Sequence, residues 1–132
     1  MEVIKSYPPN YKDIQNAGFG EKTTVYCFGN KIYNPSGIEI PPDIEFHELR
    51  HSKQQGEAPE IWWSKYLYDS DFRFSQELEA FAYQYQLVKS IYPTKAHKEA
   101  LYEMADVLST KYRLKISHLE AENEIRKKEK TL

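Results

Sequence analysis

The run His47-Glu48-Leu49-Arg50-His51 has the form H-E-x-x-H, with two histidines four positions apart. On a helix, residues i and i+4 share one face, so both imidazoles can bind a single Zn²⁺ at about 2.0–2.1 Å. Glu48 falls beside that face, where its carboxylate can reach a water molecule on the metal. Such a water has a pKa of about 7 and becomes a nucleophile when a carboxylate accepts its proton. The spacing therefore predicts a zinc-dependent hydrolase with Glu48 as general base.

A catalytic zinc site needs a third protein ligand and one open position. A later segment of the chain supplies two candidates, Glu77 and Glu79, on either side of Leu78. At 100° per residue, Glu77 falls roughly 70° from the centre of the apolar stripe of that segment, and Glu79 roughly 130° from it. Glu77 is therefore the preferred third ligand, and Glu79 is the alternative.

The remaining histidines and polar aromatic residues are weaker candidates for the site. Residues 52 to 56 contain neither the third histidine nor another ligand of the metzincin pattern, and His97 and His118 are expected to be packed or solvated. A donor for the developing oxyanion could come from the segment that joins the two ligand helices. The candidates are Tyr66, Tyr68, Arg73 and Tyr83. Each of them is expected to have a structural role rather than a catalytic one, and the same holds for Trp62 and Trp63.

The elements before the motif are expected to form a small antiparallel sheet. Residues 23–28 are rich in β-branched and aromatic side chains, and Gly29-Asn30 supplies a tight turn before a second strand over 31–33. A third strand is expected over 38–40, after the turn at 34–37. A weak helical pattern starts at Tyr11 and stops at Gly18.

Proline, glycine and capping residues indicate where the expected helices begin and end. The motif helix is expected to begin at Pro41-Pro42-Asp43 and to end near Gln55. A short helix over 59–68 and an irregular turn over 69–71 follow it. Ser75 is expected to cap a longer helix that ends at Pro93. Thr94 opens the next helix, and Ser117 with Glu120 matches a capping box for a last charged helix.

With 132 residues, the chain has the length of one domain, 1–132, divided into a metal-site core over 23–92 and C-terminal helices over 93–132. We therefore predict an α+β fold. A small antiparallel sheet of about three strands packs on an active-site helix, and a helical C-terminal half follows.

Net charge and cysteine content limit the expected cellular compartment and the expected binding partners. A net charge of −2 argues against a broad nucleic-acid footprint, so no nucleic-acid partner is expected. Cys27 is the single cysteine, which excludes an intramolecular disulfide framework. No export signal or membrane-length apolar stretch is apparent, so a cytoplasmic setting without a membrane partner is expected.

The two ligand segments together resemble the gluzincin metallopeptidases, in which a second helix after the H-E-x-x-H helix carries a glutamate ligand. Glu77 followed by Ala80 is similar to the E-x-x-A signature of several gluzincin families. The resemblance covers about residues 23 to 92. It is closest to minimal gluzincins and phage-associated H-E-x-x-H proteins, which also follow the motif with glutamine, here Gln54 and Gln55.

The resemblance implies a compact fold whose small antiparallel sheet holds an extended peptide substrate by strand addition at its edge. Many gluzincins also place Asp or Asn four residues after the ligand glutamate, to orient a histidine. Here Phe81 follows Glu77 at that distance and Tyr83 follows Glu79. The partner that orients the histidine, and the choice between Glu77 and Glu79, therefore stay open at this point.

Two other functions fit the same residues. The metal could support folding of a binding module that performs no hydrolysis, with the last helices as an interaction surface. The chain could also be a metallohydrolase that acts on a non-protein substrate or on a peptide crosslink of a cell wall. Composition and spacing do not separate these substrates, and they do not indicate the oligomeric state.

Overall fold

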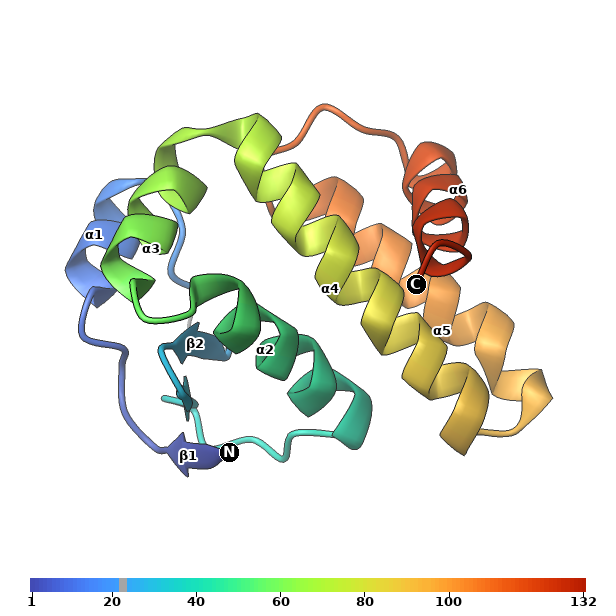
Figure 1. Cartoon of the computed structure of the whole chain (residues 1–132), viewed down its shortest axis with the longest axis horizontal. Helices are drawn as coiled ribbons and strands as arrows, with labels where there is room; N and C mark the ends of the chain where they lie inside the picture. Colours follow the sequence, from blue (N-terminus) through green and yellow to red (C-terminus); the bar gives the residue numbers. More distant parts are fainter. Residues whose placement is uncertain (22–23) are drawn as a thin grey trace. The chain divides into compact units, whose positions relative to one another are not determined.

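The computed structural model describes residues 1–21 and 24–132, which form two compact units, residues 1–69 and residues 70–132 (Figure 1). The division falls directly before the helix that carries Glu77, whereas the predicted metal-site core ended at residue 92. The expectation of one metallohydrolase domain over 1–132 stays a prediction.

The first unit contains a three-stranded sheet among its described residues, with the strand order β1-β3-β2. Its strands are β1 (Glu2–Ile4), β2 (Tyr26–Phe28) and β3 (Lys31–Tyr33). Strands β2 and β3 form the predicted antiparallel hairpin, with Cys27 opposite Ile32. The turn between them needs Gly29, whose φ of +64° suits the first central position of a type II′ turn. Residue 23, where the first strand was expected to begin, lies outside the described residues.

The predicted third strand over 38–40 is wrong, because its place beside β3 is taken by β1. Strand β1 pairs with β3 in parallel, so the sheet is mixed rather than antiparallel. The backbone N–H of Asn34 donates to the carbonyl oxygen of Ile4 at 2.8 Å, and its side-chain Nδ2 donates to that of Ile38 at 2.7 Å. The first bond continues the pairing of β3 with β1, the second closes the turn after β3, and Ile38 is left 48% exposed.

Three helices complete the first unit: α1 (Tyr11–Asn16), α2 (Pro42–Gln55) and α3 (Pro59–Tyr68). The bounds of α2 and α3 are those predicted, since a proline opens each helix and Gly56, with a φ of +56°, ends α2. Helix α2 packs against β2 and against α3 (Figure 1). The predicted packing of the sheet on the motif helix is therefore confirmed.

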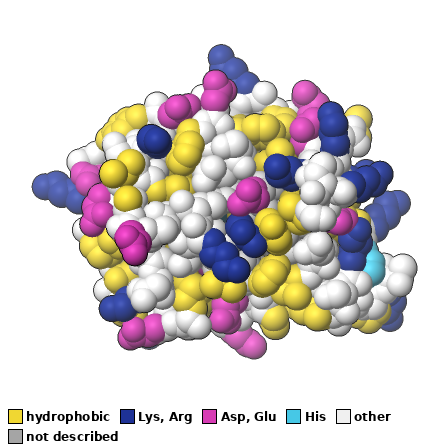
Figure 2. Space-filling model, viewed as in Figure 1, with side chains coloured by type: hydrophobic (Ala, Val, Ile, Leu, Met, Phe, Trp, Pro, Cys, Tyr) yellow, Lys and Arg dark blue, Asp and Glu magenta, His cyan; other side chains and the backbone are white. Residues whose placement is uncertain are grey.

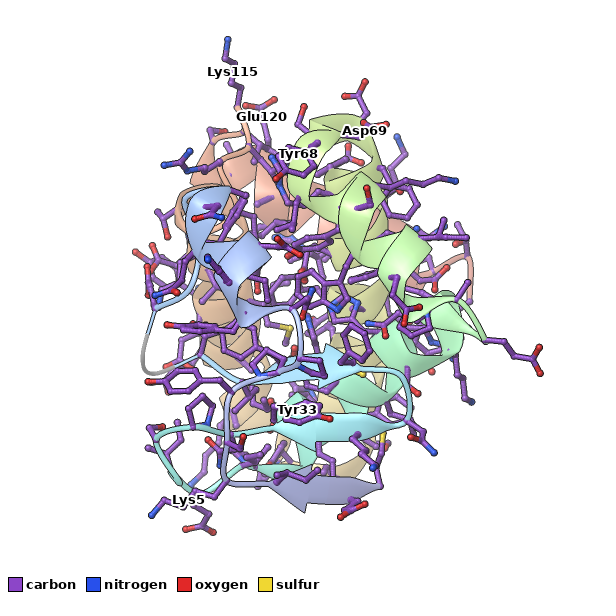
Figure 3. The ribbon with its side chains drawn as sticks, turned by 90° about the vertical axis from the view of Figure 1, so that its left-hand side faces the viewer. Lys5, Tyr33, Tyr68, Asp69, Lys115 and Glu120 are labelled. Carbon is purple, nitrogen blue, oxygen red and sulfur yellow. The ribbon has the colours of Figure 1, made fainter. Side chains whose placement is uncertain are left out.

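Strand β3 alternates between a buried and an outward face. Ile32 is fully buried, while Lys31 and Tyr33 on either side of it are half-buried, and Figure 3 labels Tyr33 on this strand. Aromatic rings of α3 add to the interior, with Trp62 stacked on Tyr66 at a centroid distance of 4.9 Å. The small unit thus gains much of its buried area from a few large rings.

The second unit consists, in its described part, of three helices that pack on one another: α4 (Ser70–Ile91), α5 (Thr94–Thr110) and α6 (His118–Glu129) (Figure 1). Their fully or nearly fully buried side chains form one apolar core. Its members are Phe81, Val88, Leu101, Met104, Ala105, Leu108, Ala121 and Ile125.

Helix α4 begins earlier than predicted. The expected irregular turn is correct at Asp69, but the helix starts at Ser70, so that Ser75 lies inside it and does not cap it. The Ser75 hydroxyl donates to the carbonyl oxygen of Phe72 at 2.8 Å, which is a bond that serine makes within a helix. Packing of Phe74 on the apolar core stabilises this first stretch of helix.

The start of α6 follows the predicted capping box. The Ser117 hydroxyl accepts from the backbone N–H of Glu120, and the Glu120 carboxylate accepts from the N–H of Ser117, both at 3.1 Å. These bonds lower the pKa of Glu120, whose side chain is exposed. Lys115, in the segment before the helix, projects away from the chain (Figure 3).

The α+β class and the helical C-terminal half are confirmed. Basic and acidic side chains are interspersed on the face shown in Figure 2, so that face presents a mixed charge. None of the helices in the described ranges is long and apolar enough to cross a membrane.

Candidate metal centre

His47 and His51 lie one turn apart on α2, as the H-E-x-x-H spacing predicts. Both side chains are 5% exposed, and their ring centroids are 4.8 Å apart with an interplanar angle of 81°. Buried imidazoles on adjacent turns can direct one nitrogen each at a common point. This pair could therefore supply two imidazole nitrogens to one metal ion.

The ring of His51 is held on several sides. Its Nδ1 lies 2.7 Å from Oε1 of Gln54, three residues later on the same helix. The indole of Trp62, from α3, lies against the ring at a centroid distance of 5.3 Å. These contacts limit how far the imidazole can rotate, so its other nitrogen, Nε2, has a defined direction.

Glu48 is buried as well, at 7% exposed. Its negative charge acts on the thiol of Cys27 in β2, where burial first and the Glu48 carboxylate second raise the pKa of that thiol. The Cys27 side chain is therefore a neutral, apolar neighbour of the carboxylate at physiological pH.

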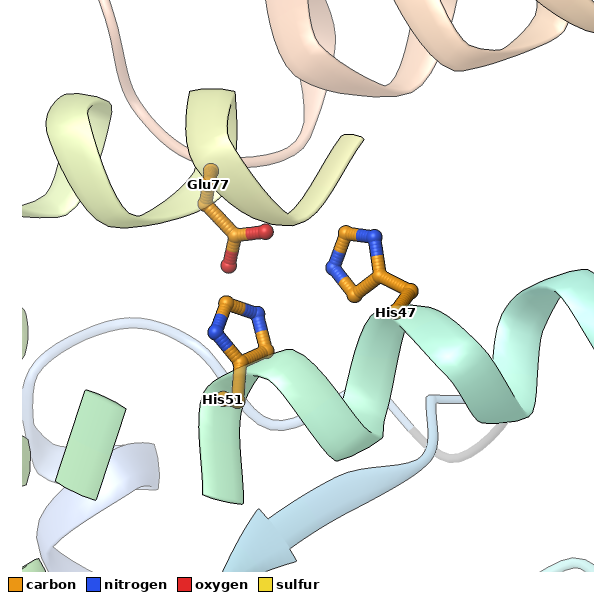
Figure 4. Close-up of side chains that lie close together, drawn as sticks. All are labelled: His47, His51 and Glu77. Atoms are coloured by element: carbon orange, nitrogen blue, oxygen red, sulfur yellow. The ribbon is translucent and has the colours of Figure 1, made fainter. Parts of the chain in front are cut away.

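Glu77, on α4 of the second unit, is 2% exposed and could hold a metal ion together with His47 and His51 (Figure 4). Two imidazole nitrogens and one carboxylate oxygen are the donor set of many catalytic zinc sites. The residues therefore fit the ion by their chemistry.

Glu79 is half-buried and is not part of this group. In the part of the chain that the structure describes, no other three His, Cys, Asp or Glu side chains are grouped closely enough to hold a metal ion. His97 Nε2 lies 2.9 Å from the carbonyl oxygen of Tyr92, and His118 Nε2 lies 2.7 Å from the Glu122 carboxylate. The downstream histidines thus have local partners, as expected.

The four candidates for an oxyanion donor have different surroundings. Tyr66 belongs to the aromatic cluster with Trp62 and Trp63, and Tyr68 is 72% exposed. Arg73 is buried and donates from Nε to the carbonyl oxygen of Tyr112 at 2.7 Å, within the second unit. Tyr83 is half-buried. None of these contacts identifies an oxyanion donor.

Sequence reasoning missed the roles of the two glutamines that follow the motif. Gln54 contacts a motif histidine, and Gln55 bonds to the β2–β3 hairpin through Cys27 and Gly29. A polar side chain three residues after a ligand histidine lies on the same side of the helix, which was the available signal for Gln54. For Gln55 the only signal in the sequence was its position, four residues after His51 on the same helix face.

Comparison with known proteins finds no matching family model, no matching curated protein and no matching solved structure. The likeness to gluzincins therefore stays a resemblance carried by the motif and the glutamate segment.

Proposed function

We propose that this protein is a zinc-dependent hydrolase, and more narrowly a metallopeptidase, with His47, His51 and Glu77 as metal ligands. The observation that supports the proposal is that the residues selected by the spacing, His47, His51 and Glu77, are all buried and could together hold one metal ion. Side chains without a common role are not expected to combine burial, metal-ligand chemistry and the spacing of the motif.

In this proposal, Glu48 accepts and donates the proton that moves from the attacking water to the leaving amine. Held by these ligands, zinc would supply a bound water with a pKa of about 7. The Glu48 carboxylate accepts the proton of the attacking water and then passes it to the leaving amine, so that it ends the cycle ionised.

The proposed substrate is an extended peptide added to the edge of the sheet. The carbonyl oxygen of Cys27 in β2 already accepts hydrogen bonds from Gln55 at 2.8 Å and from the indole of Trp63 at 3.0 Å. A peptide that pairs with β2 must therefore bond to other backbone groups or compete with these two donors.

A second function has its own supporting observation. All three ligand residues and Glu48 are at most 7% exposed, so an ion bound to them could stabilise a buried site without turnover. In that case the ion stabilises a binding module, and Glu48 has no chemical role.

Metal content and turnover of the full chain distinguish these functions. Elemental analysis after metal removal and zinc reloading should give one zinc per chain in wild type and in Glu48→Gln. Only the enzyme predicts that a peptide library is cut by wild type and that Glu48→Gln is slower by about 10²–10⁴-fold. Zinc binding without cleavage of peptides or of cell-wall crosslinks supports the binding module. A zinc content near zero in wild type rules out both.

A further inference from the structure

The contact between Gln54 and His51, both on α2, determines which ring nitrogen of His51 carries the proton. Oε1 of Gln54 is 2.7 Å from Nδ1 of His51, which is a normal hydrogen-bond distance. A carbonyl oxygen can only accept a hydrogen bond, so the proton in this contact belongs to Nδ1. In a neutral imidazole, the lone pair is then on Nε2.

The surroundings of the ring add to this effect. His51 is 5% exposed, and Trp62 and His47 both contact its ring, at centroid distances of 5.3 and 4.8 Å. Rotation that would exchange the two nitrogens is therefore opposed by packing, and the hydrogen bond selects which nitrogen carries the proton. The imidazole is prepared for binding a cation through Nε2 before any ion arrives.

We propose that Gln54 is the positioning residue of His51, which sets its tautomer and ring orientation for the metal. This inference rests on the proposed function, in which His51 is a zinc ligand. Phe81 and Tyr83, four residues after the two candidate glutamates, are neither carboxylates nor amides. Here the orienting group comes from the motif helix itself.

The tautomer is measured on the metal-free full chain labelled with ¹⁵N-histidine, by long-range ¹H–¹⁵N correlation at pH 8, above the ordinary imidazole pKa of about 6.5. His51 is assigned from the spectrum of His51→Gln. We expect its proton on Nδ1 in wild type and an increased share on Nε2 in Gln54→Met. A wild-type His51 with its proton on Nε2 overturns the inference, whether or not the protein binds zinc.

Zinc affinity, measured by competition with a chromogenic chelator, gives the second readout. We expect Gln54→Met to bind zinc about ten- to hundredfold more weakly, as is typical when the partner of a ligand histidine is lost. Gln54→Glu keeps an acceptor of the same length and should bind at least as tightly as wild type. Gln86→Met, the same change at an exposed position of α4, should leave both the tautomer and the affinity unchanged.

Failure of this inference and failure of the proposed function give different results. A protein that binds no zinc refutes the proposed function, while the tautomer comparison still tests Gln54. Wild-type affinity and tautomer in a folded Gln54→Met refute the inference alone. If circular dichroism shows that Gln54→Met is unfolded, Gln54→Asn, whose amide is one methylene shorter, takes its place with the same expected losses.

Discussion

The side-chain amide of Gln55, the last residue of α2, donates a hydrogen bond of 2.8 Å to the carbonyl oxygen of Cys27 in β2. The other end of the same amide accepts from the backbone N–H of Gly29 at 2.7 Å. Two residues 28 positions apart in sequence are thus joined at the hairpin turn. Because α2 carries the H-E-x-x-H motif, this contact helps to hold the motif helix in place on the sheet.

Replacement of Gln55 by leucine should therefore destabilise the fold. The substitution removes both bonds and leaves the Gly29 N–H without its side-chain acceptor, while Trp63 still donates to Cys27. We expect a loss of about 1–3 kcal/mol in the free energy of unfolding, measured by urea denaturation of the metal-free protein. Gln86→Leu, at an exposed helix position, should change it by less than about 0.5 kcal/mol. Equal stabilities of the two variants would contradict this role of Gln55.

Glu77→Ala should weaken zinc binding far more than Glu79→Ala. Glu77 is 2% exposed and belongs to the metal-ligand group, whereas Glu79 is half-buried and does not. Loss of a ligand should exceed the ten- to hundredfold loss typical of an outer partner, so we expect more than a hundredfold for Glu77→Ala. Chelator competition ranks the two variants. A weaker Glu79→Ala would mean that the ligand lies two residues later in α4.

The buried Cys27 thiol should make stability fall at alkaline pH. Burial, with the charge of Glu48 as the second cause, raises the pKa of the thiol in the folded state. The unfolded thiol loses its proton near pH 8.5 while the folded one keeps it, so deprotonation favours unfolding above that pH. Each pH unit should cost about 1.4 kcal/mol in the free energy of unfolding.

Urea denaturation of wild type and Cys27→Ala between pH 7.5 and 10 measures this slope. The free energy of wild type should fall more steeply above pH 8.5 than that of the variant. Burial also raises the pKa of Tyr26 to about 12 from 10, so its contribution has the same sign but begins only above pH 10. Parallel curves for the two proteins below pH 10 would show that the thiol does not titrate on unfolding.

The capping box of α6 should contribute to the stability of the helical unit. Ser117→Ala removes the hydroxyl that accepts from the Glu120 N–H at 3.1 Å. We expect a loss of about 1 kcal/mol, as for other N-cap serines, measured by thermal or urea denaturation. Ser117→Asp retains an acceptor at the N-cap and should keep most of the stability. If alanine and aspartate behave alike, the hydroxyl has no capping role.

Local signals in the sequence were sufficient for most of the helices. Pro42, Gly56 and Pro59 act on their own backbone dihedral angles and hydrogen bonds, so the bounds of α2 and α3 could be predicted without knowledge of the fold. The box of Ser117 and Glu120 spans a single helical turn and is local in the same way. Periodicity also placed His47 and His51 on one face.

Tertiary structure decided the features that depend on distant partners. Strand β1, rather than residues 38–40, occupies the place beside β3, because strand pairing depends on backbone groups about thirty residues away and not on β propensity alone. Packing of Phe74 and its neighbours decided that α4 begins at Ser70. The bond of Gln55 to Cys27 is likewise long-range. Helix spacing determines which side chains share a face, but only the folded chain determines what that face meets.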